Sequence, residues 1–147
     1  MLFYYVATMK TLRLILGDQL SHDISSLKDC NKTEDIILMC EVWNEATYVK
    51  HHKKKIAFLF SAMRHFAKEL KESGYKILYT KLEDEQNIGF FKSEIARALK
   101  QQKVEHIVVT HPGEYRVIED IKGWATNFKI SVAVSYTHLT LPTSDLV

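Results

Sequence analysis

The sequence predicts an α/β fold, a Rossmann-like, doubly wound sheet of five parallel strands in the order 3-2-1-4-5, arranged with its helices in three layers. Short apolar segments rich in β-branched residues alternate along the chain with segments of helical periodicity, which is typical of parallel strands buried on both faces. Right-handed crossovers between such strands favour the doubly wound order. The length of 147 residues, with 46% hydrophobic and 26% charged residues, fits one globular domain.

Five apolar segments are the expected strands. The first is stopped by Gly17, and the fourth is followed by His111-Pro112-Gly113, a sequence typical of a turn. The expected strands are residues 12–16, 36–40, 76–80, 106–110 and 129–134.

Helices are expected between these strands. The longest, residues 53–72, carries apolar residues every three or four positions, and Gly74 stands where a helix C-cap belongs. Residues 90–100 and 114–127 are two further helices, and Ser21 is a candidate N-cap for a short helix at residues 23–27. The positions expected to face the sheet are Ile56, Leu59, Phe60, Met63, Phe66, Ala67 and Leu70, then Phe91, Ile95, Ala98 and Leu99, then Val117, Ile118, Ile121, Trp124 and Ala125.

The composition argues against several classes of function. A net charge of +2 is too small by itself to indicate a nucleic-acid-binding protein, and the basic run Lys53–Lys55 is typical of a solvated helix start. The two cysteines, Cys30 and Cys40, cannot supply a four-cysteine metal or iron–sulfur site and fit a reducing compartment. No apolar run reaches the ~20 residues that span a bilayer. We therefore expect a cytoplasmic monomer with no membrane segment and no metal site.

Polar clusters follow the strands at one edge of the predicted sheet. In doubly wound folds, ligands bind outside the carboxyl ends of the strands, where Gly17–Gln19, Glu41–Tyr48 and His111–Arg116 are expected to converge. The first cluster lacks the G-x-G-x-x-G and G-x-x-x-x-G-K motifs of the usual dinucleotide and triphosphate sites. Asp18 and Gln19 suit hydrogen bonds to a heterocycle or a ribityl chain, although Asp18 equally suits the cap of a turn.

Three segments carry a resemblance to a known family: LRLILGDQLS at residues 12–21, EVWNEATYVKHHKKKIAFLFSAMRHFA at residues 41–67 and PGEYRV at residues 112–117. They resemble the deoxyribodipyrimidine photolyase-related family, the bacterial cryptochromes and photolyases that carry an iron–sulfur cluster. The resemblance runs from Met9 to about Val132 and covers the family's N-terminal α/β domain. It implies that residues 9–134 form an antenna domain, and that FAD and the iron–sulfur cluster belong to a C-terminal domain beyond this chain.

The resemblance also implies a bound chromophore, 6,7-dimethyl-8-ribityllumazine. A flat heterocycle needs apolar and aromatic walls with a few fixed polar groups. Tyr48 and Trp43 suit the walls, unless they only pack against their own loop, and Glu45 and Asp18 suit hydrogen bonds from the imide or the ribityl hydroxyls. By resemblance, the residues that line the pocket are Gly17, Asp18, Gln19, Cys40, Glu41, Glu45, Tyr48 and Leu59.

Residues 135–147 depart from the family pattern. The segment SYTHLTLPTSDLV shows neither helical nor alternating periodicity, and it resembles translated cloning or sequencing-adapter sequence. We therefore expect a non-family tail of artificial origin, which we leave out of the functional argument.

The leading hypothesis is the light-harvesting, chromophore-binding domain of a photolyase- or cryptochrome-like DNA-repair flavoprotein. Such a domain would have no catalytic residue and would meet DNA only through the full-length lyase. The alternatives are a free-standing nucleotide-binding α/β module or small transferase, and a protein-interaction domain. An extracted lumazine or flavin absorbs visible light and a nucleotide absorbs only in the ultraviolet, whereas an interaction domain would leave the pocket empty.

Overall fold

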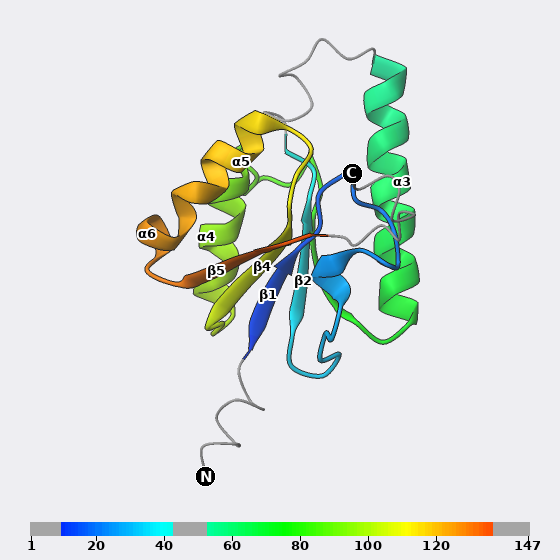
Figure 1. Cartoon of the computed structure of the whole chain (residues 1–147). Helices are drawn as coiled ribbons and strands as arrows, with labels where there is room; N and C mark the ends of the chain where they lie inside the picture. The colour runs from blue at the N-terminus through cyan, green and yellow to red at the C-terminus, as the bar shows by residue number, and fades with distance from the viewer. Residues whose placement is uncertain (1–9, 43–52, 137–147) are drawn as a thin grey trace, which may run out of the picture.

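A computed structural model of the chain describes residues 10–42 and 53–136, and the structural statements below concern these residues. Strands and helices alternate along them, as the sequence predicts (Figure 1). In chain order the elements are β1 (Thr11–Leu14), η1 (Ser25–Leu27), β2 (Ile36–Cys40), α3 (Lys53–Glu72), β3 (Lys76–Thr80), α4 (Phe91–Gln101), β4 (His106–Thr110), α5 (Tyr115–Lys122), α6 (Trp124–Phe128) and β5 (Ser131–Ser135).

The five strands form one parallel sheet in the order β3-β2-β1-β4-β5, which confirms the predicted doubly wound fold. The chain leaves β1 toward β2 and β3 on one side and returns to β4 and β5 on the other. The order therefore reverses between β1 and β4, and this is the place where doubly wound folds open a ligand crevice.

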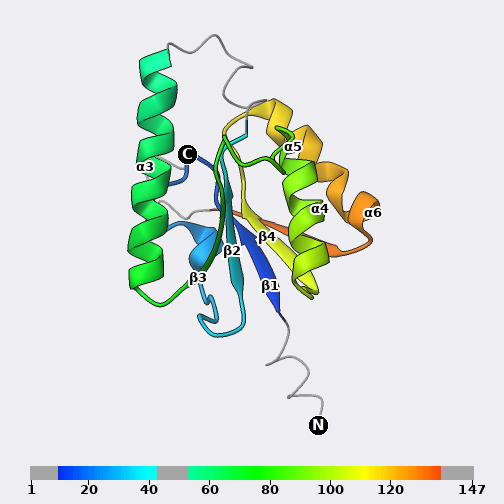
Figure 2. The ribbon, with the colours of Figure 1, turned by 180° about the vertical axis from the view of Figure 1, so that it is seen from behind.

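Two hydrophobic cores lie on opposite faces of the sheet, and alternate residues of β2 enter each. Ile36, Leu38 and Cys40 belong to the core beneath α4, α5 and α6, whereas Ile37 and Met39 belong to the core beneath α3 and η1. All five side chains are buried. Figures 1 and 2 show α3 on one side of the sheet and α4, α5 and α6 on the other, giving three layers.

The long helix α3 has the bounds that its periodicity predicts. Its second half is buried through Met63, Phe66, Ala67 and Leu70, while Ile56, Leu59 and Phe60 in its first half are only half-buried. Gly74 follows with a φ of 98°, the left-handed conformation of a helix C-cap, and the Tyr75 amide donates to the Leu70 carbonyl at 3.1 Å. The first half of α3 thus leaves apolar surface beside the carboxyl edge of the sheet.

Some element boundaries differ from the predicted ones. The single helix expected at residues 114–127 is wrong, because the chain forms α5 and α6 with Gly123 between them, and the Gly123 amide donates to the Asp120 carbonyl at 3.1 Å in a tightened last turn. Ala125, expected to be buried, is exposed. The expected helix at residues 23–27 is the shorter 3₁₀ turn η1, β1 ends at Leu14 rather than Leu16, α4 begins one residue later, and β5 begins at Ser131.

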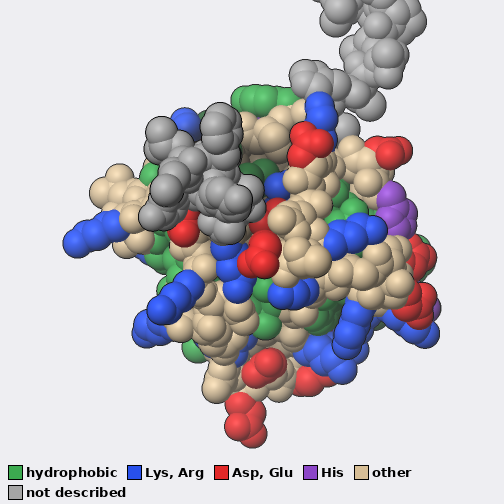
Figure 3. Space-filling view, turned by 90° about the horizontal axis from the view of Figure 1, so that it is seen from below, with side chains coloured by type: hydrophobic (Ala, Val, Ile, Leu, Met, Phe, Trp, Pro, Cys, Tyr) green, Lys and Arg blue, Asp and Glu red, His purple; other side chains and the backbone are tan. Residues whose placement is uncertain are grey.

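The surface at the amino ends of the strands is strongly polar. Figure 3 views this end of the molecule and shows lysine, arginine, aspartate and glutamate side chains interspersed over it. Of the helices in the described ranges, none has the length and apolar character needed to cross a membrane.

Candidate functional site

The loops that follow β1 and β4 meet at the carboxyl edge of the sheet, and Gln19 joins them. Its side-chain amide donates to the Thr110 carbonyl at 2.9 Å, and its side-chain oxygen accepts from the Leu16 amide at 3.2 Å. Gln19 is buried, so both bonds are shielded from water. They fix the loop after β1 against the end of β4, at the point where the strand order reverses.

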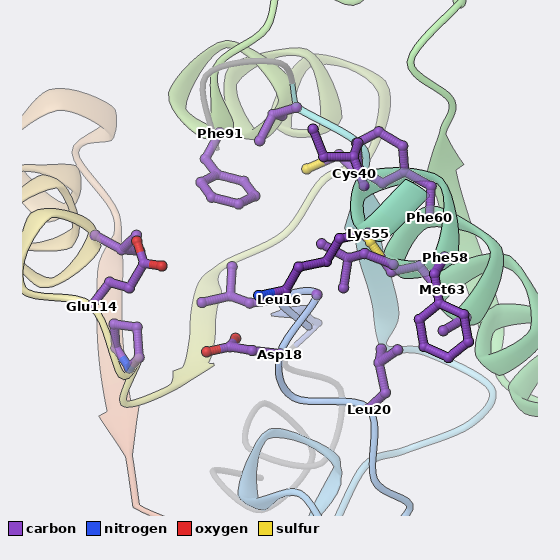
Figure 4. A pocket seen from close by; sticks show the side chains of 17 residues that line it. Leu16, Asp18, Leu20, Cys40, Lys55, Phe58, Phe60, Met63, Phe91 and Glu114 are labelled. Carbon is purple, nitrogen blue, oxygen red and sulfur yellow. The ribbon is translucent and has the colours of Figure 1, made fainter. Parts of the chain in front are cut away.

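A cavity of about 520 Å³ opens beside this junction, between the first half of α3 and the loops of the carboxyl edge (Figure 4). Its walls are mainly apolar, contributed by α3, by the ends of β1 and β2, and by the starts of α4 and α5. The lining residues are Leu16, Gly17, Asp18, Leu20, Cys40, Val42, Lys55, Ile56, Phe58, Leu59, Phe60, Ala62, Met63, Phe91, Pro112, Glu114 and Val117.

Gly17 allows the loop after β1 to pass close over α3. A Cβ atom at this position would lie 3.2 Å from the Met63 sulfur and 3.3 Å from Leu59 Cδ1, which is tighter than ordinary contact. Asp18 comes next and borders the loop after β4, since a Cβ on Gly113 would lie 3.7 Å from Asp18 Oδ2. The missing side chain at residue 17 therefore lets the loop pack closely on Leu59 and Met63 of α3, and all three residues line the cavity.

The charged groups of the cavity are few. Asp18, Lys55 and Glu114 are the charged residues among those that line it, and Figure 4 shows all three side chains directed toward the cavity. Cys40 is buried in its wall, and burial raises the pKa of its thiol, so the sulfur is a neutral wall atom at physiological pH. The cavity thus offers apolar contact with a few hydrogen-bonding groups.

Glu41 lies at the same edge, but its carboxylate is directed away from the cavity. Arg64 Nε and Nη2 donate to its two oxygens at 2.7 and 2.8 Å, the Leu82 amide donates at 2.9 Å, and the Tyr79 hydroxyl donates as well. Burial raises the pKa of the Glu41 carboxyl, but these hydrogen bonds outweigh it and hold that pKa below its usual value. Glu41 therefore fixes β2 against α3 and β3 instead of lining the cavity.

Comparison with known proteins places the chain in a family. The model of the deoxyribodipyrimidine photo-lyase-related proteins matches residues 13–146, nearly the whole sequence. The chain belongs to this family. Over 126 residues, 86% of its length, it is 51% identical to a protein from Agrobacterium fabrum (strain C58 / ATCC 33970) described as a (6-4) photolyase. The resemblance carried by the three sequence segments is thus confirmed at the level of the family.

This photolyase-related chain is short beside its relative. The aligned part is 25% of the Agrobacterium protein, so the chain spans about a quarter of the length of the curated relative that it matches. The family match also extends over residues 135–146, which the sequence analysis set apart as a tail, and β5 runs to Ser135. The domain boundary at residue 134 stays a prediction.

The structure brings together four of the eight residues that the family resemblance implies. Gly17, Asp18, Cys40 and Leu59 line the cavity, whereas the side chains of Gln19 and Glu41 are engaged elsewhere. Glu45 and Tyr48, like Trp43, lie outside the described residues. The described ranges contain no group of three His, Cys, Asp or Glu residues placed to hold a metal ion.

Sequence reasoning missed several residues of this photolyase-related cavity. Glu114 lies within the cluster after β4 but was not singled out, because an acid at a helix start is ordinary. Phe91 and Val117 were assigned to the core, where they also pack, and nothing in their spacing separates a core position from a cavity wall. The motif PGEYRV was the available signal, since Pro112, Glu114 and Val117 all line the cavity.

Proposed function

We propose that this chain is the light-harvesting, chromophore-binding domain of a photolyase-related DNA-repair flavoprotein, and that its cavity binds 6,7-dimethyl-8-ribityllumazine. In the full-length protein the lumazine would absorb blue light and pass the energy to reduced FAD, which donates an electron to a DNA photoproduct. FAD and an iron–sulfur cluster would be held by parts of that protein beyond this chain.

The observation that carries the proposal is the cavity at the carboxyl edge. Its volume of about 520 Å³ lies within the range of small-molecule sites, and it lies at the reversal of strand order where such folds bind ligands. Four of the residues that the family resemblance implies, Gly17, Asp18, Cys40 and Leu59, line it. Family membership supports the same ligand class, because the chain is 51% identical to a protein described as a photolyase.

The chemistry of the walls agrees with a flat, uncharged heterocycle. Leu59 and Met63 from α3 provide apolar contact on one side, and Phe91 and Val117 provide it on the other. The Asp18 carboxylate can accept hydrogen bonds from ribityl hydroxyls. Such a ligand would bury apolar area without leaving unpaired charge in the cavity.

A matched pair of substitutions on α3 tests the proposal. Ala62 lines the cavity, whereas Ala57 is exposed on another face of the same helix. Ala62→Phe fills part of the cavity and should weaken lumazine binding by about tenfold or more, while Ala57→Phe should leave the affinity within about threefold. Fluorescence anisotropy of the lumazine gives the affinities, and thermal melting confirms that both variants fold.

Equal affinities of the two variants, or no binding of the lumazine by the unmodified chain, would remove the antenna assignment. Extraction from purified protein adds an independent check, because a lumazine absorbs visible light and a nucleotide does not. We further expect the purified chain alone to contain no stoichiometric iron and to show no light-dependent repair of DNA lesions. Iron in the purified chain, or repair by it, would mean that this chain itself carries part of the repair machinery.

A further inference from the structure

Two walls of the cavity come from residues at the ends of regular elements. Val42 lies just after β2, which ends at Cys40, and Phe91 is the first residue of α4. Both side chains are buried and belong to the same hydrophobic core. Figure 4 shows the Phe91 ring at the cavity, across from α3. Because the chain reaches α4 through residues 81–90, this loop decides where Phe91 lies relative to Val42.

Asn87, in that loop, makes three hydrogen bonds through its side-chain amide. Its Nδ2 atom donates to the Glu41 carbonyl at 2.7 Å and to the Lys81 carbonyl at 3.0 Å, and its Oδ1 atom accepts from the Gly89 amide at 2.9 Å. The side chain is half-buried. One side chain thus joins the backbone at the end of β2 to the backbone just before α4.

The start of α4 has no capping side chain at its N-cap. Phe90 occupies that position and makes no side-chain capping hydrogen bond. Gly89, before it, has a φ of 94°, a conformation that glycine adopts without strain. On the other side of the link, the Glu41 amide donates to the Thr80 carbonyl at 2.9 Å, so the end of β2 is anchored to β3. The bonds of Asn87 therefore tie an uncapped helix start to a fixed strand end.

We infer that Asn87 is a positioning residue of the lumazine site, which sets the separation of the Val42 and Phe91 walls without touching the ligand. Asn87 is not among the residues that line the cavity. The inference rests on the proposed function and adds to it a residue outside the cavity on which the affinity depends. A rigid heterocycle binds well only when supporting hydrogen bonds hold the walls close to the geometry that fits it.

Two substitutions separate the bonds of Asn87. Asn87→Ala removes all three, whereas Asn87→Asp keeps an oxygen for the Gly89 amide but cannot donate to the Glu41 carbonyl. Both should weaken the binding of 6,7-dimethyl-8-ribityllumazine by about fivefold or more, because the end of β2 is no longer tied to the start of α4. Fluorescence anisotropy gives the dissociation constants, at a temperature where thermal melting shows each variant to be folded.

Asn31→Ala is the matched control. Asn31 also holds a turn through its side chain, since its Oδ1 atom accepts from the amides of Thr33 and Glu34 at 3.0 and 3.3 Å, but it precedes β2 at the amino end of the sheet. Its substitution should lower the melting temperature and leave the lumazine affinity within about twofold. A merely structural role would change the melting temperature alone, so the dissociation constant distinguishes the two roles.

The Asn87→Asp variant decides the question by itself if Asn87→Ala does not fold. Unchanged affinity in Asn87→Asp, or an equal loss of affinity in Asn31→Ala, overturns the inference while leaving the lumazine site standing. If the unmodified chain does not bind the lumazine, the proposed function itself fails and the inference fails with it.

Discussion

At the amino end of the sheet, a buried ion pair has its hydrogen bonds satisfied within the protein, whereas at the carboxyl end an apolar cavity has few polar groups. Arg13 Nε donates to Asp35 Oδ2 at 3.0 Å, and Arg13 Nη1 donates to the carbonyls of Ser26 and Lys28 at 2.9 Å each. Asp35 also accepts from the Thr11 amide at 3.1 Å. The carboxyl end has instead the 520 Å³ cavity described above.

This difference separates groups that hold the fold together from groups that remain for a ligand. A buried charge whose hydrogen bonds are all made within the protein contributes to a unique structure but has no capacity left for another molecule. Glu41 shows that the distinction does not follow position alone, because it lies at the carboxyl end and yet is saturated by Arg64, Tyr79 and Leu82.

The largest expected effect is on the amino end. Arg13→Met keeps the bulk of the side chain but leaves the buried Asp35 carboxylate without its cation, which typically costs about 3–5 kcal/mol of folding free energy. Urea unfolding measures the loss, and Lys28→Met, at an exposed neighbouring position, serves as the control. A loss below about 1 kcal/mol would show that the ion pair does little to stabilise the fold, which would contradict the contrast drawn between the two ends of the sheet.

Met63 sharpens the comparison because the same side chain packs in a hydrophobic core and lines the cavity. It is 2% exposed in the core beneath α3 and also lines the cavity, so Met63→Ala should cost about 2–5 kcal/mol of stability and weaken lumazine binding as well. Phe60→Ala, at a half-buried position of the same helix, should cost less than Met63→Ala. Chemical denaturation measures the loss of stability in each variant. A larger loss for Phe60→Ala than for Met63→Ala would mean that the core beneath α3 extends further toward the start of the helix.

Glu41 gives the smallest effect, and one that depends on pH. Because its pKa in the folded chain lies below its ordinary value of 4.5, its carboxylate stabilises the fold above that pH and loses this contribution as the pH falls through the folded pKa. Glu41→Gln should therefore lose about 1–3 kcal/mol near neutral pH, and the gap to the unmodified chain should close in acid.

Unfolding free energies measured from about pH 7 to about pH 3 test this dependence. Glu83→Gln is the control, since its carboxylate also contacts Arg64 but is 67% exposed. A gap between Glu41→Gln and the unmodified chain that stays constant across the range would mean that the carboxylate remains ionised or contributes no charge-dependent stability.

The strands could be predicted closely from the sequence, because β2 is apolar and buried throughout, and the partly buried β3 and β4 each keep three apolar residues in a row. β2, β3 and β4 have the predicted bounds. The break between α5 and α6 was missed because Val117, Ile121 and Trp124 keep a spacing of four and three residues across Gly123, so the apolar pattern is the same with or without the break. Helical periodicity reports which residues face the core, not whether the backbone hydrogen bonds continue.

The site could be predicted only in part. Extended backbone places alternate side chains on opposite faces, so Cys40 and Val42 face one way while Glu41 faces the other, toward Tyr79 and Arg64. That alternation was available in the sequence, but the partners of Glu41 come from α3 and β3, and their proximity depends on the tertiary fold. Gln19 was expected in the pocket, and its bond to the loop after β4 was not predicted for the same reason, since its acceptor Thr110 is brought to it by the pairing of β1 with β4.

The central position of β1 also bears on the order in which the molecule is completed during synthesis. Leu12 pairs with Ile36 on one side, but on the other side Thr11 pairs with His106, which follows much later in the chain. A nascent chain can therefore join Arg13 to Asp35 early, while Pro112, Glu114 and Val117 reach the cavity only after β4 has been made. The half of the sheet built first holds its own ion pair, and the binding cavity comes into existence only when the second half docks.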